Sequence, residues 1–132
     1  MKTVHVSGKR KRAIAKATIA AGSGRVKVNN IMLDNYQPVM ARMKIREPLI
    51  LADAMAGKYD ISVRVQGGGF MSQAEAVRLA IARALVAASK SDALKDAYLK
   101  YDRQLLVADT RRKEMYKPND SKARAKRQKS YR

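Results

Sequence analysis

The sequence predicts one domain of mixed α and β structure, residues 1–110, followed by a basic tail, residues 111–132. Two neighbouring segments carry this prediction. Apolar and polar side chains alternate over Tyr59–Gln66, which is typical of a strand with one buried face. Apolar residues then recur at helical spacing from Met71 to Ser89, which predicts a long helix.

Shorter patterns predict further strands. The sequence Val-His-Val beginning at Val4 has the composition of a strand. Over Arg12–Ala21 the alanines favour a helix. A tight Gly22–Gly24 turn that leads into a strand favours an antiparallel partner instead, and we interpret this segment as a strand. Apolar and polar residues also alternate over Arg25–Asn29, so Gly22–Gly24 is predicted to be a hairpin turn.

Two short helices are predicted before the strand at residue 59. Asp34 or Asn35 can cap the first of them, and Pro48 ends it. Pro48 also suits the first turn of the second helix, which stops at Gly57.

The long helix has two apolar faces, so we expect a sheet to cover one face and another segment to cover the other. The predicted covering segment is a helix that begins at Ser91. Its apolar stripe consists of Leu94, Tyr98, Tyr101 and Leu105.

The composition indicates a polyanionic partner. The chain has 29 Lys or Arg against 11 Asp or Glu, a net charge of +18, and no acid before Asp34. Nucleic acid is the favoured partner, and an anionic membrane surface is the alternative. No apolar run is long enough to span a membrane. No apolar signal sequence opens the chain, so we expect it to be cytosolic.

Cofactor and enzyme chemistry have little support. There is no cysteine, which excludes disulfides and thiolate metal sites, and the single histidine, His5, cannot form a metal site alone. A Ser/His/Asp grouping needs a histidine near a nucleophile, and no pair of carboxylates stands out. We therefore expect no metal, no cofactor and no catalysis.

The best structured candidate site is the loop Gly67-Gly68-Gly69 between the clearest strand and the long helix. A strand, a glycine loop and a helix can hold phosphate on backbone N–H groups. A dinucleotide site is not supported, because a second mononucleotide-binding half is absent. No Lys-Ser or Lys-Thr follows the glycines, which excludes a P-loop. Two interpretations stay open: a sharp turn with positive φ, or a contact with an RNA backbone.

Clusters of cations are the other candidates. Lys9, Arg10, Lys11 and Arg12 are contiguous, with no acid nearby, and we predict that they contact nucleic acid rather than form a merely solvated surface. The tail Ser121–Arg132 has six Lys or Arg and no aliphatic core residue, so it cannot fold alone and requires a polyanion. Tyr131 either stacks on a base or makes no contact. Weaker candidates are Arg42, Lys44 and Arg46, and also Arg111, Arg112 and Lys113.

The chain resembles the small-subunit ribosomal protein nine family in three separated regions. The central region comprises Gly67–Gly69, Ser72-Gln73, Arg78 and Ile81–Leu85. The opening HVSGKRKRAIAKA and the closing ARAKRQKSYR match as well, so the resemblance covers essentially the whole chain. The ending QKSYR resembles the archaeal and eukaryotic branch of the family, and the absence of an N-terminal extension and Lys126-Arg127 before Gln128 favour the archaeal type.

The resemblance implies a two-layer α+β sandwich, with a four-stranded sheet and helices on one face, related to the second domain of small-subunit ribosomal protein five. It implies binding to ribosomal RNA in the head of the small subunit, beside neighbouring ribosomal proteins. The tail would thread through RNA to the anticodon stem-loop of the peptidyl-site transfer RNA. The residues implied to line the RNA passage are Lys122, Arg124, Lys126 and Arg127, and those implied to contact transfer RNA are Lys129, Ser130, Tyr131 and Arg132.

One departure from the family pattern concerns Met115–Asp120, which replaces a joint that is often rich in glycine. The exit path of the tail is therefore not predicted. Two other functions stay open: a general DNA- or RNA-compacting protein, and a phosphate-binding enzyme with a related sandwich fold.

Overall fold

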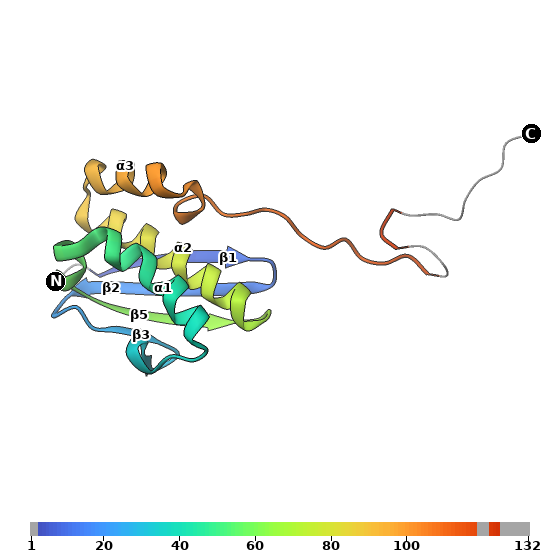
Figure 1. The fold of residues 1–132 in the computed structure, drawn as a ribbon, viewed down its shortest axis with the longest axis horizontal. Helices are drawn as coiled ribbons and strands as arrows, with labels where there is room; N and C mark the ends of the chain where they lie inside the picture. The colour runs from blue at the N-terminus through green and yellow to red at the C-terminus, as the bar shows by residue number, and fades with distance from the viewer. Residues whose placement is uncertain (1–2, 119–121, 125–132) are drawn as a thin grey trace, which may run out of the picture.

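A five-stranded sheet with helices over one face forms the body of the protein in a computed structural model, which describes residues 3–118 and 122–124 (Figure 1). The α+β class is confirmed, but the predicted number of four strands is wrong because a two-residue strand extends one edge. The order across the sheet is β1-β2-β5-β3-β4. The strands are β1 (Val4–Arg10), β2 (Ala13–Ala21), β3 (Val26–Val28), β4 (Ile31–Met32) and β5 (Tyr59–Gln66).

The predicted hairpin through Gly22–Gly24 is wrong. β5 lies between β2 and β3, antiparallel to β2 and parallel to β3. Asp60, in β5, accepts hydrogen bonds from the backbone N–H groups of Ser23 (2.8 Å) and Arg25 (2.9 Å). The glycine turn is thereby tied to β5, and the chain crosses over this strand instead of folding back beside β2.

The ambiguous segment at residues 12–21 is a strand, as interpreted. Its alanines at positions 13, 15 and 17 are buried and face the helix layer. The neighbouring strand β1 approaches that layer even more closely, since a Cβ on Gly8 would lie 2.5 Å from the carbonyl oxygen of Ala76. Small residues on both strands therefore allow a helix to pack directly against the backbone of the sheet.

Three helices and three short 3-10 turns make up the rest of the body. The helices are α1 (Val39–Ala52), α2 (Phe70–Ser89) and α3 (Asp92–Tyr101), and the turns are η1 (Leu33–Asn35), η2 (Asp53–Lys58) and η3 (Arg103–Leu105). The long helix predicted from Met71 is confirmed as α2, and Ser91 caps α3 by accepting a hydrogen bond from the N–H of Leu94.

The predicted break at Pro48 is wrong. α1 continues through this proline and ends at Ala52, and Asp34 and Asn35 lie in η1 rather than at its cap. Pro48 is buried, and its carbonyl oxygen accepts a 2.7 Å hydrogen bond from the hydroxyl of Tyr98 in α3. Tertiary packing of α1 therefore outweighs the local cost of a proline within the helix.

α2 lies at the centre of the domain, as its two apolar faces predict. One face packs against β1 and β2. The other packs mainly against α1, and the helix predicted to cover it, α3, makes only a small part of this contact. Buried between the helices is Arg78, whose Nη2 lies 2.6 Å from Oε2 of Glu47 and 3.0 Å from Oδ2 of Asp102. Within the described residues, no helix is long and apolar enough to cross a membrane.

The chain leaves the body after η3. Residues 107–118 contain no helix or strand; Asp109 still pairs with Arg10 of β1, and the chain beyond it runs away from the sheet as an extended segment (Figure 1). Arg83 of α2 holds the start of this segment, because its Nε donates to the carbonyl oxygen of Leu106 (2.9 Å) and its Nη1 to that of Ser7 in β1 (3.1 Å). We call residues 106–113 the arm root.

Candidate nucleic-acid interface

The glycine loop and the contiguous cations, predicted as separate sites, are neighbours in the fold. Gly67 and Gly68 have φ of +78° and +67°, so the turn with positive φ is confirmed at both positions. A Cβ on Gly67 would lie 2.5 Å from the carbonyl oxygen of Arg12. The glycine turn therefore packs directly against the end of the β1–β2 hairpin, and both lie at one end of the sheet.

The backbone at the start of α2 is open to a ligand on this side. Gly69 is the residue before the helix and has no side chain to cap it. The first N–H groups of a helix have no partner within the helix and carry partial positive charge. Gln73 fixes the turn, since its Nε2 donates to the carbonyl oxygen of Gly67 (3.2 Å).

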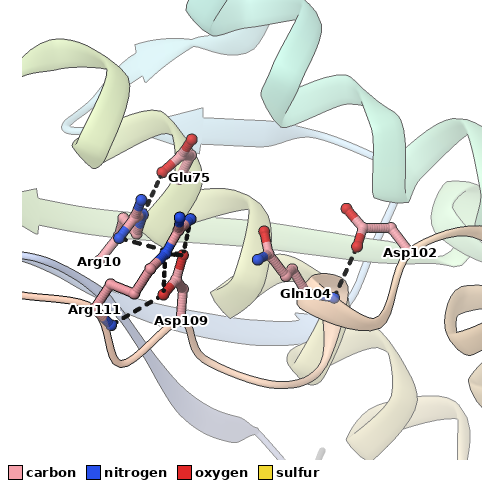
Figure 2. A network of polar contacts seen from close by, with 6 residues as sticks. All are labelled: Arg10, Glu75, Asp102, Gln104, Asp109 and Arg111. Carbon is pink, nitrogen blue, oxygen red and sulfur yellow. Dashed lines mark hydrogen bonds and ion pairs between the residues drawn. The ribbon is translucent and has the colours of Figure 1, made fainter.

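Arg10 differs from the other three cations of the hairpin because it is committed to ion pairs (Figure 2). Its Nε lies 2.7 Å from Oε2 of Glu75 in α2, and its Nη1 lies 3.4 Å from Oδ2 of Asp109 in the arm root. Only 14% of its side chain is exposed. Arg10 thus joins the hairpin, the long helix and the arm root.

Asp109 completes this junction. Its carboxylate accepts hydrogen bonds from the Arg111 guanidinium, the shorter at 2.7 Å, and from the Arg111 backbone N–H at 3.0 Å. These bonds, together with the charge of Arg10, hold the pKa of Asp109 far below its usual range. The carboxylate is therefore ionised at neutral pH, and the arm root is anchored beside the hairpin. We call Arg10, Glu75, Asp109 and Arg111 the arm-root junction.

Asp102 makes a second anchor nearby. Burial alone would raise the pKa of Asp102, but hydrogen bonds from the Gln104 N–H (2.9 Å) and the Arg78 guanidinium (3.0 Å) hold it below the usual range. Asp102 and Gln104 lie next to the arm-root junction in Figure 2.

The remaining hairpin cations are available for a ligand. Lys9, Lys11 and Arg12 are exposed, and none of them forms an ion pair with any residue that the structure describes. Lys11 is at the tip of the hairpin, with φ of +52°. The hairpin tip therefore presents three free positive charges beside an open glycine turn.

The arm presents further cations. Arg112 and Lys122 are exposed, and the Lys113 ammonium lies 4.7 Å from the centre of the Tyr116 ring. Arg124 is committed to Glu114, with its Nη2 2.5 Å from Oε1. The predicted contacts Lys126, Arg127, Lys129, Ser130, Tyr131 and Arg132 lie outside the described residues.

The weaker candidates on α1 lie in two different places. Arg42 and Arg46 both bind Asp34, Arg42 through the backbone carbonyl and Arg46 through the carboxylate. Lys44 lies with Lys9 and Arg10 around a small cleft that also contains Arg78 and Asp102.

The sequence reasoning missed the acids of this region. Glu75 and Asp109 were not singled out, although each is an isolated acid among basic and apolar residues. Such isolated carboxylates in a very basic chain are the only local signal for the junction that they form. Among the described residues, no group of three or more His, Asp or Glu side chains could hold a metal ion.

Comparisons with known proteins extend over the whole chain. Residues 8–132 match the family model described as ribosomal protein S9/S16. The chain is 51% identical to small ribosomal subunit protein uS9 of Methanothrix thermoacetophila and 46% identical to that of Methanococcus vannielii, each covering 100% of both chains. It is 52% identical to the protein of the same name from Pyrobaculum aerophilum, over 95% of this chain and 88% of that one. The chain therefore belongs to the ribosomal protein S9/S16 family, and the resemblance to its archaeal members is confirmed.

Proposed function

We propose that this protein is a structural constituent of the small ribosomal subunit that binds ribosomal RNA in the subunit head. The observation that carries the proposal is the family match over residues 8–132. The geometry supports it, because the free cations Lys9, Lys11 and Arg12 lie beside the open glycine turn at one end of the sheet. Phosphate groups are the ligands that such an arrangement of N–H donors and positive charges suits.

Arg10 and Arg111, which were predicted to contact RNA, have a structural role in this proposal. Both guanidinium groups already bind Asp109, so they hold the arm root in place, and Arg111, which is 77% exposed, can meet a phosphate with its free edge. Arg112, Lys113, Lys122, Arg124, Lys126 and Arg127 continue the RNA-binding surface along the arm.

The arm, residues 111–132, is proposed to reach the anticodon stem-loop of the peptidyl-site transfer RNA through Lys129–Arg132. A cationic segment without a core is ordered only where phosphates converge on it, as they do inside a ribonucleoprotein particle. The globular unit, residues 1–110, would hold the arm at the particle and contact neighbouring ribosomal proteins. The protein would act in the cytoplasm, without catalysis or a cofactor.

Sedimentation tests the proposal. A tagged copy expressed in its host is sedimented from a lysate through a sucrose gradient that contains magnesium, after a moderate salt wash. We expect it to travel with the small subunit at about one copy per particle. A protein that stays at the top, or that spreads evenly over DNA and RNA, would instead indicate general nucleic-acid compaction.

The role of the arm has its own test. Deleting Lys129–Arg132 is expected to leave assembly nearly intact and to weaken binding of transfer RNA to the peptidyl site of purified subunits. Unchanged transfer RNA affinity in the trimmed subunits would contradict the proposed contact between the arm and transfer RNA. It would not contradict the assignment of the protein to the small subunit.

A further inference from the structure

The face of the sheet that the helices do not cover is basic and uncovered in the described structure. Side chains at alternate positions of β1, β2, β3 and β5 point to this face, and their neighbours along each strand are buried beneath the helices. We call it the open sheet face. Its polar and charged residues are His5, Ser7, Lys9, Lys16, Thr18, Lys27, Ser62, Arg64 and Gln66; Ile14 lies between Lys9 and Gln66, and Ala20 and Asp60 lie at its edge.

The strand register places two cations directly opposite each other at the centre of this face. Lys16 of β2 pairs with Arg64 of β5, and both side chains are exposed. Like charges directly opposite on neighbouring strands destabilise a sheet. Two hollows of the surface meet here, and Lys16 and Arg64 line both of them. The free protein thus carries two like charges that face each other at the centre of this face.

Among the described residues, no carboxylate pairs with the cations of this face. Lys9, Lys16, Lys27 and Arg64 form no ion pair with any described residue. Asp60 lies at the end of β5 and is already bound by Arg25, whose backbone N–H hydrogen bond is the main cause of the lowered pKa of Asp60. An anionic partner is therefore the occupant that the charges favour.

The uncharged side chains of the open sheet face indicate which kind of anion binds there. Ser7, Thr18, Ser62 and Gln66 offer hydroxyl and amide groups that can bond to phosphate or to a 2′-hydroxyl. The face has no Phe, Tyr or Trp, so it lacks the stacking platform with which single-stranded bases are held. A protein partner would have to place carboxylates opposite both Lys16 and Arg64, because an unpaired charge is costly in a dry interface.

We propose that the open sheet face is a second binding surface for the backbone of ribosomal RNA, centred on Lys16 and Arg64. It rests on the proposed function, because the RNA must be that of the small subunit. The centre of this face lies away from the end of the sheet that carries the hairpin tip and the glycine turn, and the two surfaces meet at Lys9, so one small domain would hold RNA both at its end and across its face.

A charge-matched pair of variants tests the surface. Lys16→Gln/Arg64→Gln removes two charges from the open sheet face, and Lys95→Gln/Lys100→Gln removes two exposed charges from α3. Each is mixed with the parent protein during reconstitution of small subunits from purified ribosomal RNA and the other subunit proteins. We expect the first variant to be outcompeted roughly 20-fold at about 0.15 M salt, with a salt slope smaller by nearly 2, while the α3 variant competes equally.

Stability of the free protein separates binding from folding. Because the opposed charges repel, Lys16→Gln/Arg64→Gln is expected to unfold at the same or a higher urea concentration than the parent. Equal competition by both variants would overturn the proposal. If Lys16→Gln/Arg64→Gln competes poorly because it is unfolded, the claim that Lys16 and Arg64 repel each other without stabilising the fold would be overturned.

The absence of cysteine allows a direct assignment of the occupant. Ser62→Cys places a single thiol on the open sheet face, and Ala97→Cys places one on α3, both at exposed positions. An iron chelate attached to the thiol cuts nearby RNA by hydroxyl radicals in the assembled subunit. We expect strong, localised cuts from the Ser62→Cys variant. Without the chelate, its thiol should be protected from alkylation relative to the thiol of the Ala97→Cys variant.

The remaining results of the cleavage and alkylation experiments would contradict either the inference or the proposed function. Protection of the thiol in Ser62→Cys without RNA cuts would assign the face to a protein neighbour, and rapid alkylation without cuts would show that the face remains in solvent; either overturns the inference. If neither variant enters subunits although both are folded, the proposed function fails instead, so the two failures can be distinguished.

Discussion

Arg10 and Asp109 lie near opposite ends of the sequence, yet Nη1 of Arg10 is 3.4 Å from Oδ2 of Asp109. Arg10 is at the end of β1, and Asp109 is in the arm root. Glu75 of α2 holds the other side of the Arg10 guanidinium, at 2.7 Å. The position of the arm is therefore set by the same strand and helix that carry the hairpin tip and the glycine turn.

Removing Asp109 is expected to loosen the arm root without unfolding the body. In Asp109→Ala the Arg111 N–H loses its acceptor and Arg10 loses one of its two partners. We expect amide hydrogen exchange over residues 106–113 to accelerate roughly 2- to 10-fold, the effect of one lost hydrogen-bonded contact. Glu114→Ala, which removes the Arg124 pair farther along the arm, is the matched control. Equal acceleration in both variants would contradict the junction.

The arm-root junction is also expected to depend on pH in one direction. The pKa of Asp109 is lowered in the folded protein, so its stabilising contribution is complete above the unfolded value of about 3.9 and is lost as the pH falls toward the folded value. Exchange protection of the arm root, corrected for intrinsic rates, should be constant from about pH 8 to 5 and should fall below about pH 4. The control Asp109→Asn should lack this additional acid sensitivity, and a midpoint near pH 6 would exclude Asp109 as its source.

Gly67 and Gly69 are expected to differ sharply when replaced by alanine. At Gly67 an added methyl group meets the carbonyl oxygen of Arg12 at 2.5 Å, with φ of +78°, whereas at Gly69 nothing lies within 4 Å. Gly67→Ala should lower the free energy of unfolding by about 2 kcal/mol or more, since the left-handed conformation alone costs about 1–2 kcal/mol. Gly69→Ala should lower it by less than about 1 kcal/mol, the smaller cost of alanine in place of glycine at the start of a helix. Urea titration measures both, and similar values would contradict the geometry of the turn.

Arg78 is expected to be needed for packing of the three helices. It is 6% exposed, and its loss would leave Glu47 and Asp102 without their shared cation. Arg78→Leu should lower the free energy of unfolding by about 2 kcal/mol, less than for a fully buried pair because both carboxylates are partly exposed. Arg103→Leu, an exposed arginine of η3 without an ion pair among the described residues, is the control. An equal effect in the two variants, measured by urea titration, would show that Arg78 is not structurally special.

Periodicity predicted the elements whose signal is local. The alternation in Tyr59–Gln66 and the two apolar faces of residues 71–89 correspond closely to β5 and α2. The order of the strands was not predictable in this way. β5 separates β2 from β3, and the Asp60 carboxylate binds the turn after β2, so this order involves contacts between distant parts of the chain.

The candidate nucleic-acid interface was likewise only partly predictable from local sequence patterns. The hairpin cations and the glycine loop could be recognised from composition, but their adjacency depends on the close approach of Gly67 to Arg12. All four hairpin cations have the same appearance in the sequence. Only the positions of Glu75 and Asp109 separate Arg10, which anchors the arm, from the free Lys9, Lys11 and Arg12.

The central claim is that the hairpin tip, the glycine turn and the arm root form one RNA-binding surface. The single-cysteine variants Gly69→Cys and Thr110→Cys test it most directly, because neither change removes a cation and the chain has no other thiol. Both variants are assembled into small subunits, loaded with an iron chelate, and the radical cuts in ribosomal RNA are mapped. The account predicts strong cuts from both positions in the same neighbourhood of the RNA. Cuts in unrelated regions, or incorporated variants that give no cuts, would contradict it.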